Sequence, residues 1–196
     1  MSTFIFVGLG NPGEEYENTR HNAGRIILNA LVKSYDGEWK LDKKLNALVA
    51  KVKVGKASVM FVNPETFMNN SGKSVKPLIT SIKGAEKLVV VYDDLDLPFG
   101  KAKISFNKSS GGHKGLESII KAIKTEKFAR VRVGVAPTSP TGKIRKPQGE
   151  EKVMKHILGK FKPEEMLGLK KMAKKVGEAL ENFVEGGIER AMNGFN

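Results

Sequence analysis

The sequence predicts an α/β fold, a single domain built on a twisted, mixed and largely parallel β-sheet that helices flank on both faces. Short apolar runs rich in β-branched residues alternate along the chain with segments of helical periodicity. The run at 88–92 (LVVVY) is continuously apolar, as is typical of a central strand buried on both sides. A chain of 196 residues can bury one sizeable core, so we expect one domain over residues 1–196.

Apolar β-rich runs and helical spacing define the expected elements in order. Strands are expected at 4–9, 47–54, 58–62, 88–92, 101–106 and 130–135. Helices are expected at 24–35, 70–82 and 115–123. Pro77 lies inside the second of these helices, which we therefore expect to bend there or to begin later than residue 70.

The last third of the chain predicts a long amphipathic helix that begins at Pro163. Apolar residues recur at helical spacing from 169 to 184, and lysines occupy the opposite face. Proline is tolerated in a first turn, where Glu164 and Glu165 also favour the helix dipole. We interpret the lysines as a solvated face rather than an RNA contact. The preceding segment 138–149 (TSPTGKIRKPQG) is rich in proline, glycine and basic residues, which indicates a mobile surface loop.

Composition narrows the possible functions. The formal net charge is +13, from 34 lysines and arginines against 21 acidic residues. Such an excess attracts a polyanion, so a nucleic acid is the expected partner, with a lysine-rich surface for solubility alone as the alternative. The absence of cysteine excludes thiolate nucleophiles and cysteine zinc sites. Because no apolar run suits a membrane span or a signal peptide, we expect a soluble, cytoplasmic protein.

The segment 8–13 (GLGNPG) follows an expected strand and matches the glycine pattern of dinucleotide-binding sites. That pattern requires an apolar-faced helix that begins at the third glycine and holds a pyrophosphate at its N-terminus. Here residues 14–18 (EEYEN) carry three carboxylates that repel phosphate, and the helix begins only after His21. We therefore expect no nucleotide cofactor and interpret the glycines as a turn that lets Asn11 and His21 face one cleft.

A general base is the first candidate function at the carboxyl edge of the sheet. His21 follows the glycine turn and is one of three histidines in the chain. Asp93 ends the expected central strand at the same edge, where its carboxylate can accept from an imidazole N–H and raise the basicity of the ring. Asp94 and Asp96 are alternatives for that role, or these acids cap a turn.

Neutral amides and a basic glycine-rich segment complete the candidate site. In 63–72 (NPETFMNNSG), Asn69 suits substrate binding, because an amide can donate to an oxyanion and accept from a peptide N–H. Asn70 and Ser71 are better explained as helix caps. The segment 101–115 combines lysines with glycines before a helix, and its backbone N–H groups can hold a phosphate.

These segments together resemble the bacterial-type peptidyl-tRNA hydrolases. The motifs GLGNPG, YENTRHNAG, PETFMNNSG, YDDLDLPFG, SSGGHKGLESI, FARVRVGV and ERAMNGFN follow the order and near spacing of that family and cover essentially the whole chain. The resemblance implies an enzyme that hydrolyses the ester between the peptide and the 3′ ribose of tRNA in peptidyl-tRNA, and so recycles tRNA from aborted translation. It also implies a monomer that needs no metal ion and no cofactor.

The resemblance implies a role for each matching residue. It makes His21 the base that activates water and Asp93 the carboxylate that orients this base. Asn11 and Asn69 then contact the peptide main chain and the attacked carbonyl. Further residues shape the cleft or bind the acceptor stem and 3′ end of tRNA, namely Tyr16, Met68, Lys103 and Arg132.

Two positions depart from the family pattern. Lys114 stands where many members have an asparagine that is thought to position water or substrate, and a charged lysine cannot accept a hydrogen bond. We expect either that Lys114 binds phosphate or that other groups order the water. Ser105 stands where a second lysine of the basic patch is common, so that Lys101 or Lys108 would have to supply the charge. The basic residues of the 138–149 loop are a possible extension of the RNA contact.

Two other functions remain open from the sequence alone. One is an RNA-binding protein that keeps the fold but has no turnover, and the other is a hydrolase of a different aminoacyl or peptidyl ester. The presence of the whole set Asn11, His21, Asn69 and Asp93 favours an enzyme.

Overall fold

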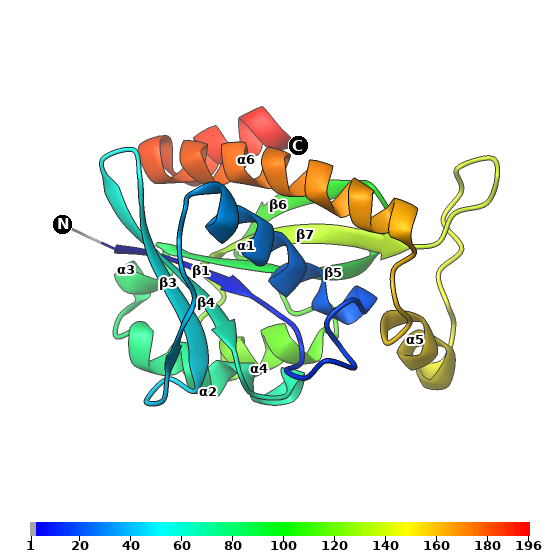
Figure 1. Cartoon of the computed structure of the whole chain (residues 1–196), viewed down its shortest axis with the longest axis horizontal. Coiled ribbons are helices and arrows are strands. Elements are labelled where there is room, and N and C mark those ends of the chain that lie inside the picture. Colours follow the sequence, from blue (N-terminus) through cyan, green and yellow to red (C-terminus); the bar gives the residue numbers. More distant parts are fainter. Residues whose placement is uncertain (1–2) are drawn as a thin grey trace.

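The computed structural model describes residues 3–196, which form one seven-stranded sheet with helices on both faces (Figure 1). The strands are β1 (Thr3–Gly8), β2 (Lys40–Asp42), β3 (Ala47–Val54), β4 (Ala57–Pro64), β5 (Leu88–Pro98), β6 (Ala102–Phe106) and β7 (Ala129–Ala136). The α-helices are α1 (Ala23–Ser34), α2 (Ser71–Val75), α3 (Ile82–Ala85), α4 (Lys114–Ile123), α5 (Glu150–Ile157) and α6 (Pro163–Phe195). Short 3-10 turns occupy Arg20–Asn22, Met68–Asn70 and Lys76–Leu78.

The sheet is mixed, with a parallel centre. Its strand order is β2-β3-β4-β1-β5-β7-β6. Strands β4, β1, β5 and β7 run parallel to one another, whereas β2, β3 and β6 are antiparallel to their neighbours. The predicted α/β class with a largely parallel sheet is therefore confirmed. The carboxyl ends of four parallel strands meet at one edge, which is where sites form in such sheets.

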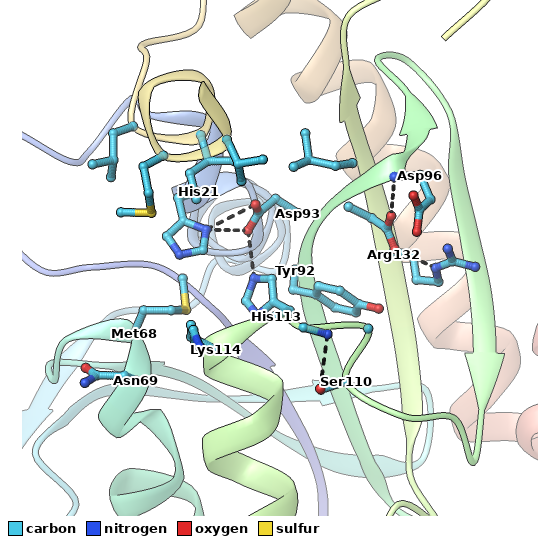
Figure 2. A pocket seen from close by; sticks show the side chains of 18 of the residues that line it. His21, Met68, Asn69, Tyr92, Asp93, Asp96, Ser110, His113, Lys114 and Arg132 are labelled. Carbon is cyan, nitrogen blue, oxygen red and sulfur yellow. Dashed lines mark hydrogen bonds and ion pairs between the residues drawn. The ribbon is translucent and has the colours of Figure 1, made fainter. Parts of the chain in front are cut away.

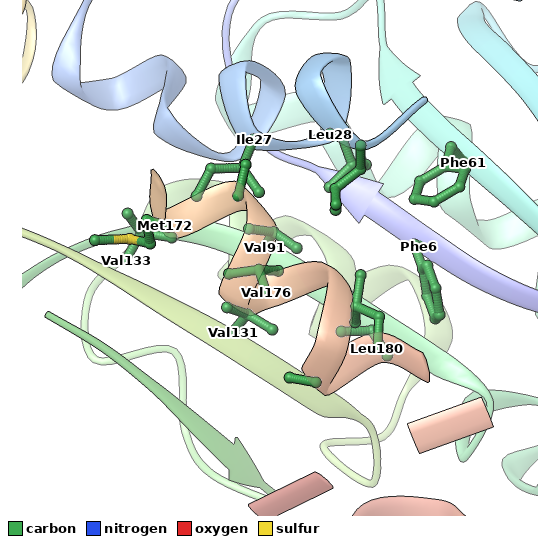
Figure 3. Packing of buried hydrophobic residues seen from close by; sticks show 14 of the residues in the cluster. Phe6, Ile27, Leu28, Phe61, Val91, Val131, Val133, Met172, Val176 and Leu180 are labelled. Atoms are coloured by element: carbon green, nitrogen blue, oxygen red, sulfur yellow. The ribbon is translucent and has the colours of Figure 1, made fainter. Parts of the chain in front are cut away.

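Alternation along the central strands sends side chains into two cores. On β1, Phe6 faces a core that α1 and α6 cover, while Ile5 and Val7 face a second core under α2 and α4. Figure 3 shows the first core, in which side chains of α1 and α6 meet over β5 and β7. Because β5 is buried on both faces, its apolar residues are continuous rather than alternating. Each fully buried aliphatic or aromatic side chain contributes about 1.5–3 kcal/mol to folding.

One predicted helix is wrong. In place of a helix over 70–82, the chain forms a 3-10 turn, the five-residue α2, a second 3-10 turn at Lys76–Leu78 and then the separate short helix α3. Pro77 explains the break, because proline has no N–H to donate and its ring crowds the preceding turn. The sequence also did not predict β2 or α5, which lie where no apolar pattern was recognised.

The end of β5 and the course of α6 differ from the sequence prediction. Strand β5 continues past Tyr92 through the acidic residues to Pro98, because it keeps pairing with β7 across a register shift between Asp94 and Pro98. Helix α6 begins at Pro163 as predicted and bends at Gly187, whose φ of 77° is one that glycine adopts readily. The segment 138–149 contains no helix or strand beyond one isolated bridge.

Within residues 3–196, no helix is both long and apolar enough to cross a membrane.

Candidate active site

An open pocket of about 1120 Å³ lies at the carboxyl edge of the parallel strands (Figure 2). The loop after β1 brings Asn11 to it, the turn after β4 brings Met68 and Asn69, and β5 carries Asp93. His21 reaches the same pocket from the 3-10 turn that leads into α1. The structure thus brings all four predicted catalytic residues to one pocket.

Two glycines allow the first turn of α1 to lie directly on the sheet. A Cβ at Gly24 would lie 2.1 Å from the carbonyl oxygen of Val91, and a Cβ at Gly8 would lie 2.8 Å from the carbonyl oxygen of Gly24. Any side chain at these positions would push α1 away from β1 and β5. The glycines therefore serve close packing, which places His21 beside Asp93.

The pair of His21 and Asp93 is the centre of the site. His21 Nδ1 lies 3.0 Å from Oδ1 and 3.1 Å from Oδ2 of Asp93, and both residues are buried. Burial of the imidazole lowers its pKa, but the charge of Asp93 and the hydrogen bond outweigh this, so that the pKa of His21 is raised above 6.5. His21 Nε2 forms no hydrogen bond within residues 3–196, and this ring edge is available to a water molecule in the pocket.

The carboxyl of Asp93 is held ionised by two histidines. Burial alone would raise its pKa, yet electrostatic attraction to His21 and His113 and their hydrogen bonds hold the pKa of Asp93 well below its usual range. No functional role was predicted for His113. Its Nε2 donates to Asp93 Oδ1 at 3.0 Å, and its Nδ1 accepts from the backbone N–H of Leu116 at 3.3 Å as the N-cap of α4. The scarcity of histidine and the position before a helix were the signals available for it.

Asn11 is oriented by three hydrogen bonds. Its backbone N–H donates to Asn22 Oδ1 at 2.9 Å, and Asn22 Nδ2 donates back to the Asn11 carbonyl at 2.9 Å. Asn11 Oδ1 accepts from the backbone N–H of Met68 at 2.8 Å. Because the oxygen of this amide is engaged, Asn11 presents its Nδ2 as a donor toward the pocket. Asn22, which sequence reasoning missed, is thus the residue that fixes the loop of Asn11.

The other predicted residues of the cleft differ in burial. Asn69 lines the pocket, is exposed and forms no side-chain hydrogen bond within residues 3–196, so both its donor and its acceptor are open to a ligand. Met68 is buried at the pocket wall, and the half-buried Tyr16 lies at its margin. A further apolar wall, which the sequence did not predict, comes from α5 and the residue after it, namely Val153, Met154, Ile157 and Leu158.

Charged residues form the opposite rim of the pocket. Arg132 Nε donates to Asp94 Oδ2 at 2.7 Å, and Lys146 pairs with Asp96 at 2.6 Å, which ties the 138–149 loop to β5. Asp94 and Asp96 are therefore occupied by cations, and the alternative that one of them orients His21 is wrong. Lys103 does not line the pocket but lies directly across from Arg132 in the β6–β7 pair.

The two departures from the family pattern also lie at the pocket. Lys114 is the first residue of α4, is exposed and approaches Glu117 only at 4.0 Å. Ser105 lines the pocket, and Lys108 beside it is exposed at the rim, whereas Lys101 is not among the lining residues. Of the two lysines proposed to replace the charge at position 105, Lys108 is the one placed to do so.

Within residues 3–196, His21, Asp93 and His113 form a group close enough to hold a metal ion. The donor atoms of His21, Asp93 and His113 all lie within 4.8 Å of one another. In the structure hydrogen bonds join them, and both rings direct a nitrogen at the same carboxylate oxygen. As arranged, the group is suited to proton transfer through His21 Nε2.

Comparisons with known proteins agree on one family. The family model described as peptidyl-tRNA hydrolase matches residues 5–196. A curated peptidyl-tRNA hydrolase of Aquifex aeolicus is 40% identical over 193 residues, which are 98% of this chain and 95% of that protein. A relative of the same name from Listeria welshimeri is 38% identical, with 98% and 99% covered. A crystal structure of the peptidyl-tRNA hydrolase from Acinetobacter baumannii superposes with a TM-score of 0.85 at 31% identity, over 98% of this chain and 93% of that chain.

Proposed function

This chain belongs to the peptidyl-tRNA hydrolase family, and we propose that it hydrolyses the ester between the peptide and the tRNA 3′ ribose with His21 as general base. An enzyme of this kind is an aminoacyl-tRNA ester hydrolase. The observation that carries the assignment of the base is the buried His21–Asp93 pair, whose free ring nitrogen faces a pocket large enough for a substrate end.

The proposed reaction begins with a water molecule at His21 Nε2. As the water oxygen attacks the ester carbonyl carbon, Nε2 takes one of its protons, and Asp93 stabilises the imidazolium that forms. The tetrahedral intermediate then expels the ribose 3′ oxygen, which receives the proton from His21. The products are a peptide carboxylic acid and a tRNA with a free 3′ hydroxyl, and His21 returns to its starting state.

The amides are proposed to bind the peptide and the developing oxyanion. Asn11 Oδ1 already accepts from the backbone, whereas its Nδ2 has no partner within residues 3–196, so this donor suits a carbonyl or an oxyanion. Asn69 keeps both groups open, so its Oδ1 suits the N–H of the last peptide bond. Aminoacyl-tRNA has a free amine there and no peptide carbonyl, so it would lose a contact with the amide donors and bind less well. Because an ester lacks amide resonance, general-base help of about 10²–10⁴ is sufficient without a nucleophilic serine.

The basic rim is proposed to bind the acceptor stem and 3′ end of tRNA. Asp94 orients the guanidinium of Arg132 through Nε, which leaves the two terminal nitrogens for a phosphate. Lys103 adds charge across the strand pair, and Lys114 adds charge at the other side of the catalytic group. We further propose that the protein acts in the cytoplasm as a monomer, without a metal ion or cofactor.

The test is release of labelled peptide from an N-blocked aminoacyl-tRNA, with His21→Ala as the comparison. We expect turnover in the unsubstituted chain and a loss of about 10²–10⁴ in kcat in the variant. Equal turnover in both proteins would remove His21 from the role of base. Binding of tRNA by both proteins with turnover in neither would instead support the RNA-binding protein without activity. An unblocked aminoacyl-tRNA cleaved as fast as the blocked one would support a hydrolase of a different ester.

A further inference from the structure

We propose that His113 is a positioning residue that holds Asp93 in the orientation and charge state required by His21, and that the N-terminus of α4 fixes His113 in the tautomer for this task. The inference rests on the proposed role of His21 as general base. It concerns a residue whose hydrogen bond is made to the carboxylate, while its ring lies beside that of the base, with centroids 5.1 Å apart.

The first support is that the two histidines share one oxygen. Asp93 Oδ1 accepts from His113 Nε2 at 3.0 Å and from His21 Nδ1 at 3.0 Å. Only 4% of Asp93 is exposed, so bulk water cannot replace a lost donor at little cost. The carboxylate is therefore fixed from two sides, once by the base and once by a residue from another element.

The second support is that the direction of the His113 hydrogen bond is fixed. Its Nδ1 accepts from the backbone N–H of Leu116, so the proton of the neutral ring resides on Nε2. His113 can then only donate to Asp93. Both oxygens of Asp93 lie within hydrogen-bond distance of an imidazole nitrogen, so a proton on the carboxyl would compete with these donors, and the arrangement favours the ionised carboxylate.

The third support is that the ring of His113 is held in place. Tyr92 packs against it edge to face, with ring centroids 4.9 Å apart and planes at 69° (Figure 2). Gly115, two residues after His113, permits the close approach of α4, because a Cβ there would lie 3.2 Å from His113 Cε1 and 2.5 Å from Met68 Sδ. Helix α4 thus places the donor as part of the packed fold.

The arrangement has a consequence for the acidity of His21. The titratable groups that face His21 are Asp93 from β5 and His113 from the N-cap of α4, whose ring centroid lies 5.1 Å from that of His21. Tyr92 packs on the ring of His113. The neighbouring Arg20 is turned toward Glu165 and the Lys160 carbonyl instead. If His113 stops donating, Asp93 attracts the His21 imidazolium more strongly, and the pKa of His21 rises further. The unprotonated base is then reached only at higher pH.

Two substitutions separate the roles of the two ring nitrogens. An asparagine places an acceptor near the position of Nδ1, so His113→Asn keeps the cap of α4 but loses the donor to Asp93. A glutamine reaches the position of Nε2, so His113→Gln keeps the donor but loses the cap. Both variants are purified as the full chain, checked for thermal unfolding, and assayed for peptide release between acid and neutral pH.

We expect His113→Asn to lower kcat about tenfold or more, with little change in KM, and to move the acid limb of the pH–kcat profile to higher pH. His113→Gln is expected to recover part of the lost kcat and to restore the position of the acid limb. An unshifted acid limb in His113→Asn overturns the proposal, because a helix cap alone does not affect the titration of His21. Equal loss in both variants without a shift assigns His113 to the fold only.

Failure of this inference is distinguishable from failure of the proposed function. If His21→Ala abolishes turnover while His113→Asn behaves as the unsubstituted chain, the base assignment stands and the positioning role fails. If His21→Ala retains full turnover, the proposed function of His21 fails whatever the His113 variants do.

Discussion

Replacing Asp93 with asparagine tests the centre of the proposed mechanism with almost no change of shape. The substitution removes the negative charge and turns one carboxylate oxygen into an NH2 group. Because His113 Nε2–H requires an acceptor, the amide oxygen is expected at the position of Oδ1. The NH2 group then lies where Oδ2 was, 3.1 Å from His21 Nδ1.

This geometry sets the expected magnitude. The NH2 group is satisfied best when His21 Nδ1 accepts, which moves the ring proton to Nε2, the atom that must take a proton from water. The variant therefore loses both the correct tautomer and the charge that stabilises the imidazolium. General-base catalysis contributes about 10²–10⁴, so kcat should fall by that factor. The KM should change little, because Asp93 is buried behind His21.

The pH profile supplies an independent result. The pKa of His21 is raised because Asp93 outweighs the effect of burial. Without that charge, burial is left to lower the pKa, and the acid limb of any residual activity should move to lower pH. This direction is opposite to the one expected for His113→Asn.

The assay is steady-state release of labelled peptide from N-blocked aminoacyl-tRNA between acid and neutral pH. Asp36→Asn is the matched control, since it makes the same change on an exposed carboxylate outside the pocket. A kcat for Asp93→Asn within about threefold of the control would refute the reasoning, because an oriented base is worth far more than this.

Three further predictions follow from particular contacts. Arg132→Ala should weaken tRNA binding and reduce the slope of log K against log salt by about one, with little effect on the hydrolysis of a tRNA-free ester. Lys53→Ala, at the far side of the sheet, should leave tRNA binding and the slope unchanged. An unchanged slope in Arg132→Ala contradicts the phosphate role. Asn11→Asp keeps the acceptor for the backbone N–H of Met68 but loses the side-chain donor to the substrate. The kcat should therefore fall about 10²–10³-fold at unchanged thermal stability. A kcat equal to that of the unsubstituted chain would show that this donor has no role in the reaction. Gly24→Ala places a Cβ 2.1 Å from a carbonyl oxygen of β5 and should destabilise the fold by about 3 kcal/mol, seen as a lower Tm. In the control Gly194→Ala, the new Cβ meets nothing closer than 3.5 Å, so the Tm should not fall. Equal Tm values for the two variants would contradict the packing argument.

The fold was predictable where burial dominates the sequence pattern. The continuous apolar run of β5 and the alternating core residues of β1 each satisfy one geometry only, so their strands were recognised. The three-residue strand β2 is too short to show a pattern, whereas α5 has apolar residues at helical spacing, Val153, Met154 and Ile157, that were not recognised. The segment around Pro77 shows the opposite error, because helical spacing was given more weight than the missing backbone donor.

The convergence of the candidate catalytic residues was predictable because the parallel strands point to one edge. Asn11 and Asn69 follow two neighbouring strands, and Asp93 lies in a third, two residues beyond its last pair with β1, so their convergence follows from topology. His113 and Asn22 were not recognised, because their roles depend on the direction of single hydrogen bonds across long sequence separations. Such contacts have no periodicity in the sequence.

The acidic run after the central strand is compatible with an RNA-binding pocket because its charges differ in depth and partner. The side chain of Asp93 is 3% exposed and is bound by histidines, whereas that of Asp94 is 11% exposed and is neutralised by Arg132. The side chain of Asp96 is 63% exposed and pairs with Lys146. A phosphate that approaches the rim therefore meets cations already oriented by carboxylates rather than free carboxylates. One strand thereby supplies the carboxylate that binds the proposed base and, nearby, the carboxylates that pair with the basic side chains of the rim, which we propose to bind tRNA.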